Sequence, residues 1–127
     1  MSLVSSIVAA LIAAGHGTAG GTDIFAYRWP PSPLSGYLII PMGGSIPSEV
    51  QGGEGIDYPG FQVQVRDPSM ETAEQLAEQV RLALNGIAAG DYTIFTTRSH
   101  AVDLTSPDDL KAGTYRFSAD FETIYVR

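Results

Sequence analysis

The sequence predicts an α+β fold, with a mostly antiparallel sheet of about five strands that is covered on one face by two helices. Two observations lead to this fold class. Residues 60–86 follow the pattern of a half-buried strand, a tight turn and an amphipathic helix without interruption. Residues 114–126 alternate aromatic and polar side chains over the length of a long strand. Because 127 residues suffice for one core, we expect a single domain over residues 1–127.

The chain begins with a short apolar segment, residues 3–14 (LVSSIVAALIAA). This segment has about half of the ~20 residues that a membrane-spanning helix needs. A secretion signal requires basic residues before its apolar core. No basic residue precedes this segment, and the first arginine is Arg28. We therefore expect a helix packed on the sheet, and a soluble, intracellular protein with no membrane contact.

Two short strands are expected next. The glycines of residues 15–22 end the first helix. Residues 23–28 and 37–40 have the composition of strands, and the proline-rich residues 29–33 between them form a stiff extended turn. Pro41 is expected to end the second strand, because proline cannot donate a ladder hydrogen bond.

Residues 42–58 (MGGSIPSEVQGGEGIDY) are the most irregular part of the sequence and predict a long loop or a hairpin extension. The segment contains Glu49, Glu54 and Asp57 and no basic residue. Irregular connections of this length in compact domains are usually functional or disordered. We therefore treat its three acids as candidate interaction residues.

The best-defined helix follows the strand at residues 61–66. Asp67-Pro68-Ser69 ends that strand and supplies a helix N-cap. Apolar residues then recur at three- and four-residue steps from Met70 to Ile87, and Gly86 occupies a position that favours a left-handed conformation. On the opposite side of this helix lie Glu71, Glu74 and Glu78, with Arg81 placed to pair with Glu78.

The last third of the chain predicts two more strands, residues 91–99 and 114–126. Residues 100–113 between them read as a loop, in which Ser106, Pro107, Asp108 and Asp109 signal a short capped turn.

Charge and cysteine content exclude several classes of function. The chain has 7 basic and 14 acidic residues, a formal net charge of −7, and no cysteine. A general nucleic-acid-binding surface needs a basic excess, which this composition lacks. Disulfides and zinc–thiolate sites are excluded as well.

No motif in the sequence predicts catalysis, a cofactor or a metal ion. His16-Gly17-Thr18 resembles the histidine motif of subtilisin-like proteases, but no matching serine motif is present. We expect an exposed His16 in a glycine-rich linker. His16 and His100 are far apart in the sequence and form no metal-binding pair, and the glycine-rich segment at 43–55 lacks the lysine of a phosphate-binding loop.

The order of these elements resembles the tail terminator proteins of long-tailed bacteriophages, also described as tail completion or minor capsid proteins. The resemblance rests on the strand at 23–25, the segment 37–40, the loop that leads to PGFQVQVR at residues 59–66, the helix that begins near Ser69, and Pro107 before an aromatic-rich last strand. The sequence departs from the pattern in residues 102–113, where the acids closely follow Pro107.

The resemblance implies a non-enzymatic structural protein of the virion at the head–tail junction, present in the host cytoplasm during assembly. Such subunits form a homo-oligomeric ring, usually a hexamer, that caps the tail tube and stops its polymerisation. The implied partners are the tail tube protein and a head-completion or stopper protein, and DNA passes through the lumen without specific binding. No cofactor is implied.

Two sets of residues are candidates for contacts in such a ring. Glu49, Glu54 and Asp57 are expected to face the lumen or the tube, where acids repel DNA phosphates; a merely solvated loop is the alternative. Arg66 is expected either to bridge to an acid of the neighbouring subunit or to contact Asp67 or Glu71 locally. Two other functions remain open: a monomeric binding or adaptor module that uses residues 42–58, and a small hydrolase that uses His16 or His100.

Overall fold

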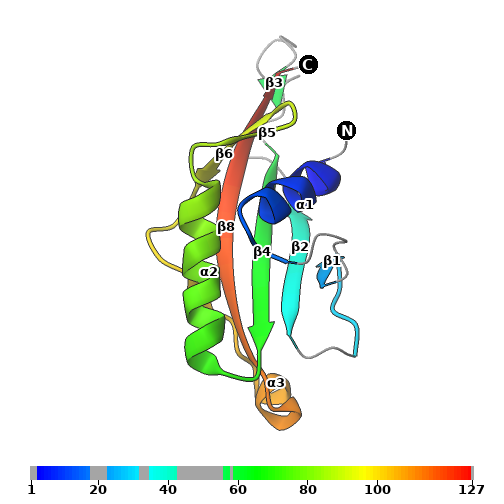
Figure 1. Cartoon of the computed structure of the whole chain (residues 1–127), viewed down its shortest axis with the longest axis vertical. Helices are drawn as coiled ribbons and strands as arrows, with labels where there is room; N and C mark the ends of the chain where they lie inside the picture. Colours follow the sequence, from blue (N-terminus) through cyan, green and yellow to red (C-terminus); the bar gives the residue numbers. More distant parts are fainter. Residues whose placement is uncertain (1–2, 18–22, 32–34, 43–55, 58, 127) are drawn as a thin grey trace.

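The computed structural model describes residues 3–17, 23–31, 35–42, 56–57 and 59–126. These residues form an elongated molecule in which a curved sheet carries its helices on one face and at one end (Figure 1). The helices are α1 (Leu3–Ala13), α2 (Met70–Leu84) and α3 (Pro107–Ala112). The strands are β1 (Ile24–Ala26), β2 (Gly36–Met42), β3 (Ile56–Asp57), β4 (Gly60–Asp67), β5 (Ala88–Ala89), β6 (Tyr92–Thr96), β7 (Val102–Asp103) and β8 (Tyr115–Val126).

The sheet has the order β1-β2-β4-β8-β6-β5, and the short strands β3 and β7 also pair with β8. Each of these pairings is antiparallel except that of β1 with β2, which is parallel. The predicted α+β fold is therefore confirmed. The five strands expected from the sequence correspond to β1, β2, β4, β6 and β8, while β3, β5 and β7 are short additions.

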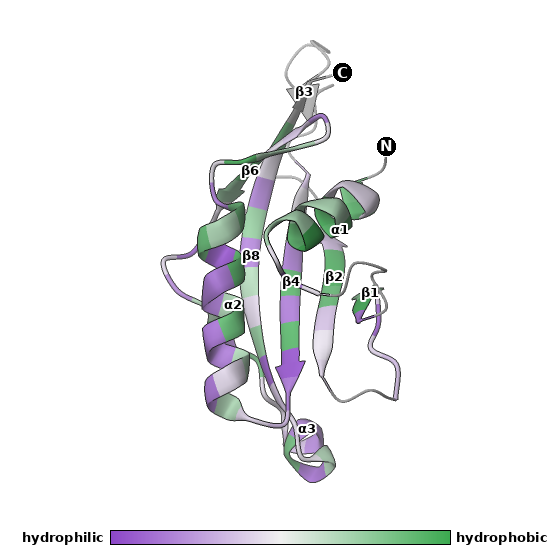
Figure 2. Ribbon diagram, viewed as in Figure 1, coloured by the Kyte–Doolittle hydropathy of each residue, from purple (hydrophilic) through white to green (hydrophobic). Residues whose placement is uncertain are grey.

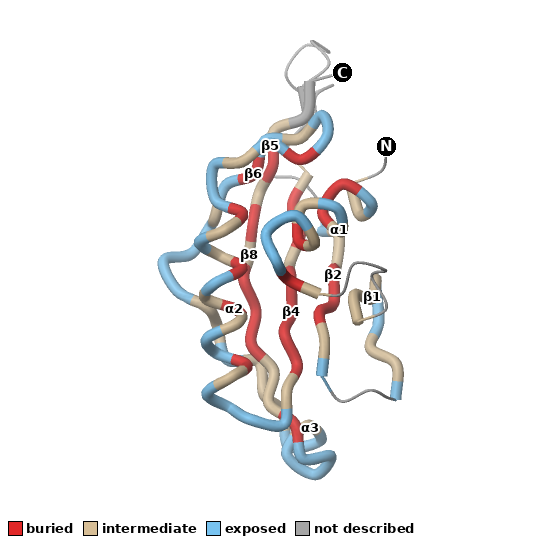
Figure 3. Tube along the Cα trace, in the orientation of Figure 1, coloured by how far each residue is buried: buried red, intermediate tan, exposed pale blue. Residues whose placement is uncertain are grey.

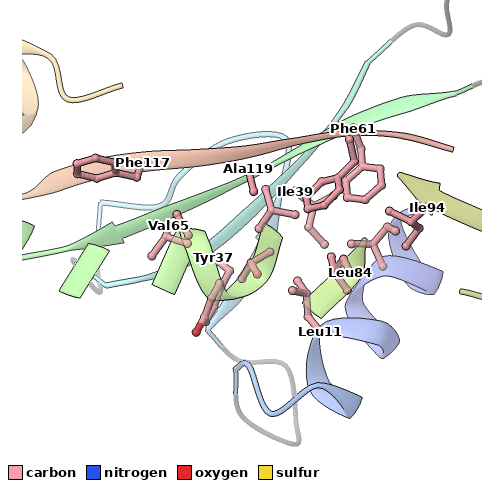
Figure 4. Close-up of a cluster of buried hydrophobic side chains, with 14 of the residues drawn as sticks. Leu11, Tyr37, Ile39, Phe61, Val65, Leu84, Ile94, Phe117 and Ala119 are labelled. Carbon is pink, nitrogen blue, oxygen red and sulfur yellow. The ribbon is translucent and has the colours of Figure 1, made fainter. Parts of the chain in front are cut away.

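The core lies between the sheet and the helices α1 and α2. On β4, Phe61, Val63 and Val65 point to this side, and Phe61 lies opposite Phe121 of β8 with the two rings stacked 4.8 Å apart. Figure 4 shows Leu11 of α1 and Leu84 of α2 meeting this layer of side chains. In Figure 3 the central strands are mostly buried, whereas the outer side of α2 is exposed. Both predicted helices thus cover the same face of the sheet.

Helix α2 forms where the sequence predicts it. The N–H of Thr72 donates to the Ser69 hydroxyl at 3.3 Å, and Ser69 is the N-cap. Every third or fourth side chain of the helix faces the core, and Gly86 has a φ of +79°, as predicted. Met70 differs from the expectation, because it is 55% exposed and lies outside the buried stripe. The buried residues of α2 are Ala73, Ala77, Val80 and Leu84.

Helix α1 packs against the sheet, as expected. Its side chains Ile7 and Leu11 are completely buried. Within the described ranges, each helix is too short or too polar to cross a bilayer.

The structure corrects the expected end of the second strand. Pro41 does not end β2, which continues through it to Met42. The backbone groups of Tyr37 and Ile39 face β1, since Tyr37 donates to Asp23 O and Ile39 O accepts from the Tyr27 N–H. Pro41 has the same orientation, so its missing N–H falls on the outer edge of β2 and costs no bond to β4.

The region from 100 to 113 contains β7 and α3, not only the expected loop. A capping box begins α3, because the Ser106 N–H donates to Asp109 Oδ2 at 2.8 Å and the Asp109 N–H donates to Ser106 Oγ at 3.2 Å. Gly113, with a φ of +78°, ends the helix. Asp109, one of the acids after Pro107 that depart from the family pattern, therefore caps a short helix.

Candidate interaction surfaces

The sheet face opposite the helices carries polar side chains that are largely removed from water. Gln62, Gln64 and Arg66 alternate with the core residues of β4, and they lie directly across from Asp120, Ser118 and Arg116 of β8. Gln64 is 5% exposed and Arg66 is 9% exposed. Polar groups buried to this extent need internal partners, and the structure supplies them for the Gln64 amide and for Nη2 of Arg66, whereas the buried Ser118 hydroxyl accepts and donates no hydrogen bond within the described residues.

A chain of hydrogen bonds crosses this polar face. Trp29 Nε1 donates to Gln64 Oε1 at 3.0 Å, and Gln64 Nε2 donates to Gln62 Oε1 at 2.7 Å. Gln62 Nε2 then donates to Asp120 Oδ1 at 2.8 Å, and Arg98 Nε donates to Asp120 Oδ2 at 2.9 Å. This series of hydrogen bonds therefore connects the segment after β1 to the segment after β6, and the side chains that form it have a structural role.

Arg66 fixes the same segment after β1 through a different contact. Its guanidinium carbon lies 4.3 Å from the centre of the Trp29 ring, and Nη2 donates to Pro30 O at 2.9 Å. Burial lowers the pKa of Arg66, and the charge of Arg116 acts in the same direction, while Asp109 opposes both. The structure thus places Arg66 against residues 29–30 of its own subunit.

Arg116, which lies directly opposite Arg66, is tied to the α3 end of the molecule. Its Nε lies 3.2 Å from Asp109 Oδ2, and Nη2 donates to Leu104 O at 3.2 Å. Asp109 is therefore a helix cap, and its negative charge also offsets the positive charges of Arg66 and Arg116.

The anchored segment begins with an unusual turn at Tyr27. The Arg28 N–H donates to Ala26 O at 2.9 Å, which closes a three-residue turn around Tyr27, and Tyr27 has a φ of +73°. This is a γ-turn of the rare, strained kind. Tyr27 is the one non-glycine residue with positive φ in the described part of the chain, and its side chain is 67% exposed. Arg28 beside it is exposed as well.

The outer side of α2 forms a second exposed surface, on the other side of the sheet. Glu71 and Glu74 are exposed, and Met70 and Leu82 are 55% and 64% exposed. Glu78 pairs with Arg81, as predicted, and also accepts from the Ala101 N–H at 2.9 Å. Hydrophilic residues recur along α2 in Figure 2.

Of the three acids predicted to face the lumen or the tube, only Asp57 belongs to the described residues. Glu49 and Glu54 lie outside the described residues. Asp57 belongs to β3, where its backbone pairs with Tyr125 of β8. Residues 43–55 and 58 lie outside the described part of the chain, so the expectation of a loop or a hairpin at 42–58 stays a prediction.

The two histidines have different surroundings. His16 is 7% exposed, so the expectation of an exposed histidine is wrong. Its Nδ1 lies 3.2 Å from the Tyr37 hydroxyl, and the two rings meet edge to face, while burial lowers the pKa of His16. His100 is exposed. No group of three or more metal-ligating side chains occurs among the described residues.

A hollow of about 490 Å³ lies between α1, the end of α2 and β5. Its lining is apolar apart from Ser6 and contains no charged side chain. The lining residues are Ser6, Ala9, Ala10, Ala13, Ala14, Ala83, Ile87, Ala88, Ala89 and Gly90. Such a lining offers packing surface and no acid, base or metal ligand.

Comparison with protein families identifies the chain. The profile described as "Bacteriophage tail terminator protein" matches residues 10–127, which include all of the sheet and the helices α2 and α3. The chain belongs to the bacteriophage tail terminator family.

The fold of this tail terminator family member has a solved counterpart. A chain of the "Virion of native gene transfer agent (GTA) particle" superimposes with a TM-score of 0.59 at 19% identity, and the match covers 99% of this chain and 98% of that chain. A search of curated proteins finds no match. Family membership indicates a structural role in completing a phage tail, in agreement with the resemblance seen in the sequence.

Sequence reasoning singled out Arg66 but missed the residues that it contacts. Trp29 stands before two prolines, which by themselves predict only a stiff turn. Its partners Gln64 and Arg66 follow 35 and 37 positions later on the polar face of β4. The single tryptophan of the sequence is the signal that could have indicated these contacts. An indole N–H that is even partly buried usually finds a hydrogen-bond partner, so Trp29 predicts one elsewhere in the fold.

Proposed function

We propose that this terminator forms a closed homo-oligomeric ring, most simply a hexamer, that caps the phage tail tube and stops its polymerisation. The ring then presents a surface to a head-completion or stopper protein. The observation that carries this proposal is the family match over residues 10–127. The mechanism requires contacts and symmetry, and it requires no reaction, cofactor or metal.

The shape of the subunit is suited to a ring. A ring needs two different surfaces on each copy, arranged so that repeated head-to-tail contacts close. The described residues offer an acidic helix surface on α2 and a γ-turn with an exposed cation at β1, and Figure 1 shows these elements on opposite sides of the central strands. The surfaces differ in both shape and charge.

The acids of residues 42–58 are proposed to face the lumen or the tube. Each subunit carries a formal charge of −7, so a ring of subunits surrounds passing DNA with negative charge. A negative lumen repels phosphates and lets DNA slide without specific binding. Changing Glu49, Glu54 and Asp57 to lysine should therefore slow DNA passage and leave ring closure intact. Unchanged DNA ejection would remove these acids from the lumen.

Arg66 is proposed to support the subunit interface by fixing residues 29–30. Its contacts to Trp29 and Pro30 are internal, so its contribution to the interface runs through the segment that it holds. A substitution of Arg66 should therefore affect both the stability of the subunit and its assembly.

A polymerisation assay with the tail tube protein of the same phage tests the proposed function. Added terminator should stop tube growth at a ratio of one ring per tube end, and electron microscopy should show capped tubes of reduced length. Tubes that grow to the same length distribution with and without the protein would contradict the proposal. A subunit that then binds another tail protein as a monomer would support the adaptor alternative, and His16-dependent ester or peptide cleavage would support the hydrolase.

A further inference from the structure

The γ-turn at Tyr27 holds two exposed side chains in a fixed position. One end of the turn is fixed by the sheet, since the Tyr27 N–H donates to Ile39 O at 3.0 Å. The other end is fixed by Trp29 and Pro30, which bind Gln64 and Arg66. A tyrosine in a left-handed conformation is strained, and such strain persists only where the surrounding contacts enforce it.

Among the described residues, the side chains of Tyr27 and Arg28 form no hydrogen bond and no ion pair that would explain the enforced conformation. Tyr27 is 67% exposed, and Arg28 forms no ion pair with any carboxylate of the described chain. Tyrosine and arginine, together with tryptophan, are enriched among the residues that contribute most of the binding energy of protein interfaces. A rigid turn also lowers the entropic cost of binding, because the two side chains are already in place.

The complementary surface lies on α2. Glu74 forms no ion pair within the described chain, and Glu71 accepts only a long hydrogen bond of 3.3 Å from Gln75. Met70 lies one helical turn before Glu74, on the same side of the helix, and is 55% exposed. Two carboxylates beside an exposed methionine offer a charge for an arginine and a soft apolar surface for an aromatic ring.

We infer that Tyr27 and Arg28 of one subunit dock on the N-terminal half of α2 in a neighbouring copy, with Arg28 against Glu71 and Glu74 and with Tyr27 on Met70. This inference rests on the proposed ring. Because β1 and α2 lie on opposite sides of the central strands (Figure 1), the contact joins two different surfaces and leaves one of each free for the next subunit.

Charge reversal and its repair test the inference on the full-length protein. Arg28→Glu and Glu74→Arg should each raise the concentration at which the subunits assemble by about tenfold or more, as measured by sedimentation velocity. The double variant Arg28→Glu with Glu74→Arg should restore assembly towards that of the wild type. Lys111→Glu is the matched control, because Lys111 is an exposed cation of α3 outside the inferred contact, and its assembly should be unchanged.

Substitution of Tyr27 separates assembly from folding. Tyr27→Gly removes the strain at φ +73°, so the melting temperature should rise, while assembly should weaken because the aromatic contact is lost. The melting temperature is measured at a concentration at which the subunits do not assemble, because assembly itself raises it. A decrease under these conditions would indicate that Tyr27 only stabilises the subunit, and would overturn the inference.

The outcomes distinguish the inference from the proposed function. If the wild type assembles or stops tube growth and the Arg28 and Glu74 variants do so equally well, only the inferred contact is wrong. A double variant that assembles no better than the weaker single variant would also overturn the contact. If the wild type neither assembles nor stops tube growth, the proposed ring itself fails.

Discussion

The guanidinium of Arg66 lies over the indole ring of Trp29, with 4.3 Å between its central carbon and the ring centre. The two residues come from opposite ends of a segment that includes β2, so their contact fastens the chain after β1 to the central strand β4. An arginine stacked on an aromatic ring while it donates to a backbone carbonyl combines two stabilising contacts in one side chain.

Arg66→Lys should destabilise the subunit. Lysine keeps the charge but loses the flat stacking surface and the geometry of the bond to Pro30 O, so we expect the free energy of unfolding to fall by about 1–2 kcal/mol. Urea denaturation followed by tryptophan fluorescence measures this change and also reports on Trp29 itself. Arg28→Lys, at an exposed position, is the control, and an equal effect of both changes would show that the Trp29 contact contributes nothing.

The pH dependence of stability should show the burial of His16. Burial lowers the pKa of His16 in the folded state below its ordinary value of 6.5. Between these two pKa values the unfolded chain binds more protons than the folded chain, so stability rises with pH through this interval. The stability that the buried, neutral His16 contributes to the folded state is therefore retained above about pH 6.5, and it declines as the pH falls below this value.

Unfolding free energies at several pH values between 5 and 8 test this prediction. The slope below pH 6.5 should be reduced in His16→Gln, which keeps a polar side chain near the Tyr37 hydroxyl and does not titrate. Equal slopes for the two proteins would show that His16 is protonated as easily in the folded state as in the unfolded chain.

Elements that depend on neighbouring residues are predictable from the sequence, whereas contacts between distant residues are not. Helix α2 has its cap at Ser69 and its left-handed glycine at Gly86 because these signals are local and are carried by neighbouring residues. The burial of His16 depends on Tyr37, which is 21 positions away, and no local pattern announces such a contact. The same holds for the hydrogen bond between Trp29 and Gln64, which lie 35 positions apart.

Local signals in residues 106–113 predict a short helix, although only a turn was expected there. Ser106 and Asp109 have the spacing of a capping box, and Pro107 suits the first helical position, so the helix was predictable from residues 106–113. The same residues predict only a short capped turn when they are taken as turn signals, and the one large apolar residue of the segment is Leu110. That side chain is 57% exposed, so capping and not core burial stabilises α3.

Asp109→Ala should therefore destabilise the α3 end of the molecule. The change removes the acceptor for the Ser106 N–H and the carboxylate beside Arg116, and we expect a loss of about 1–2 kcal/mol in the free energy of unfolding. Asp108→Ala, at the exposed neighbouring position, should change it by no more than about 0.5 kcal/mol. Chemical denaturation of both variants makes the comparison, and equal losses would contradict the role given to the Asp109 cap.

Phe121→Ala should cause the largest loss among these variants. Phe121 is 1% exposed and stacks on Phe61, so its truncation leaves a cavity in the core and should cost about 3–5 kcal/mol. Phe95→Ala removes the same side chain from a position that is 42% exposed and should cost much less. Calorimetric melting temperatures of the two variants test the assignment of the core, which similar decreases would contradict.

The mass of the protein in solution, measured by sedimentation or light scattering with and without tail tubes, tests the proposed role most directly. We predict a particle with six times the 13.5 kDa mass of one subunit, formed by the protein alone or on the tube end. A particle of one subunit's mass at every concentration, on tubes as well as in free solution, would contradict the ring.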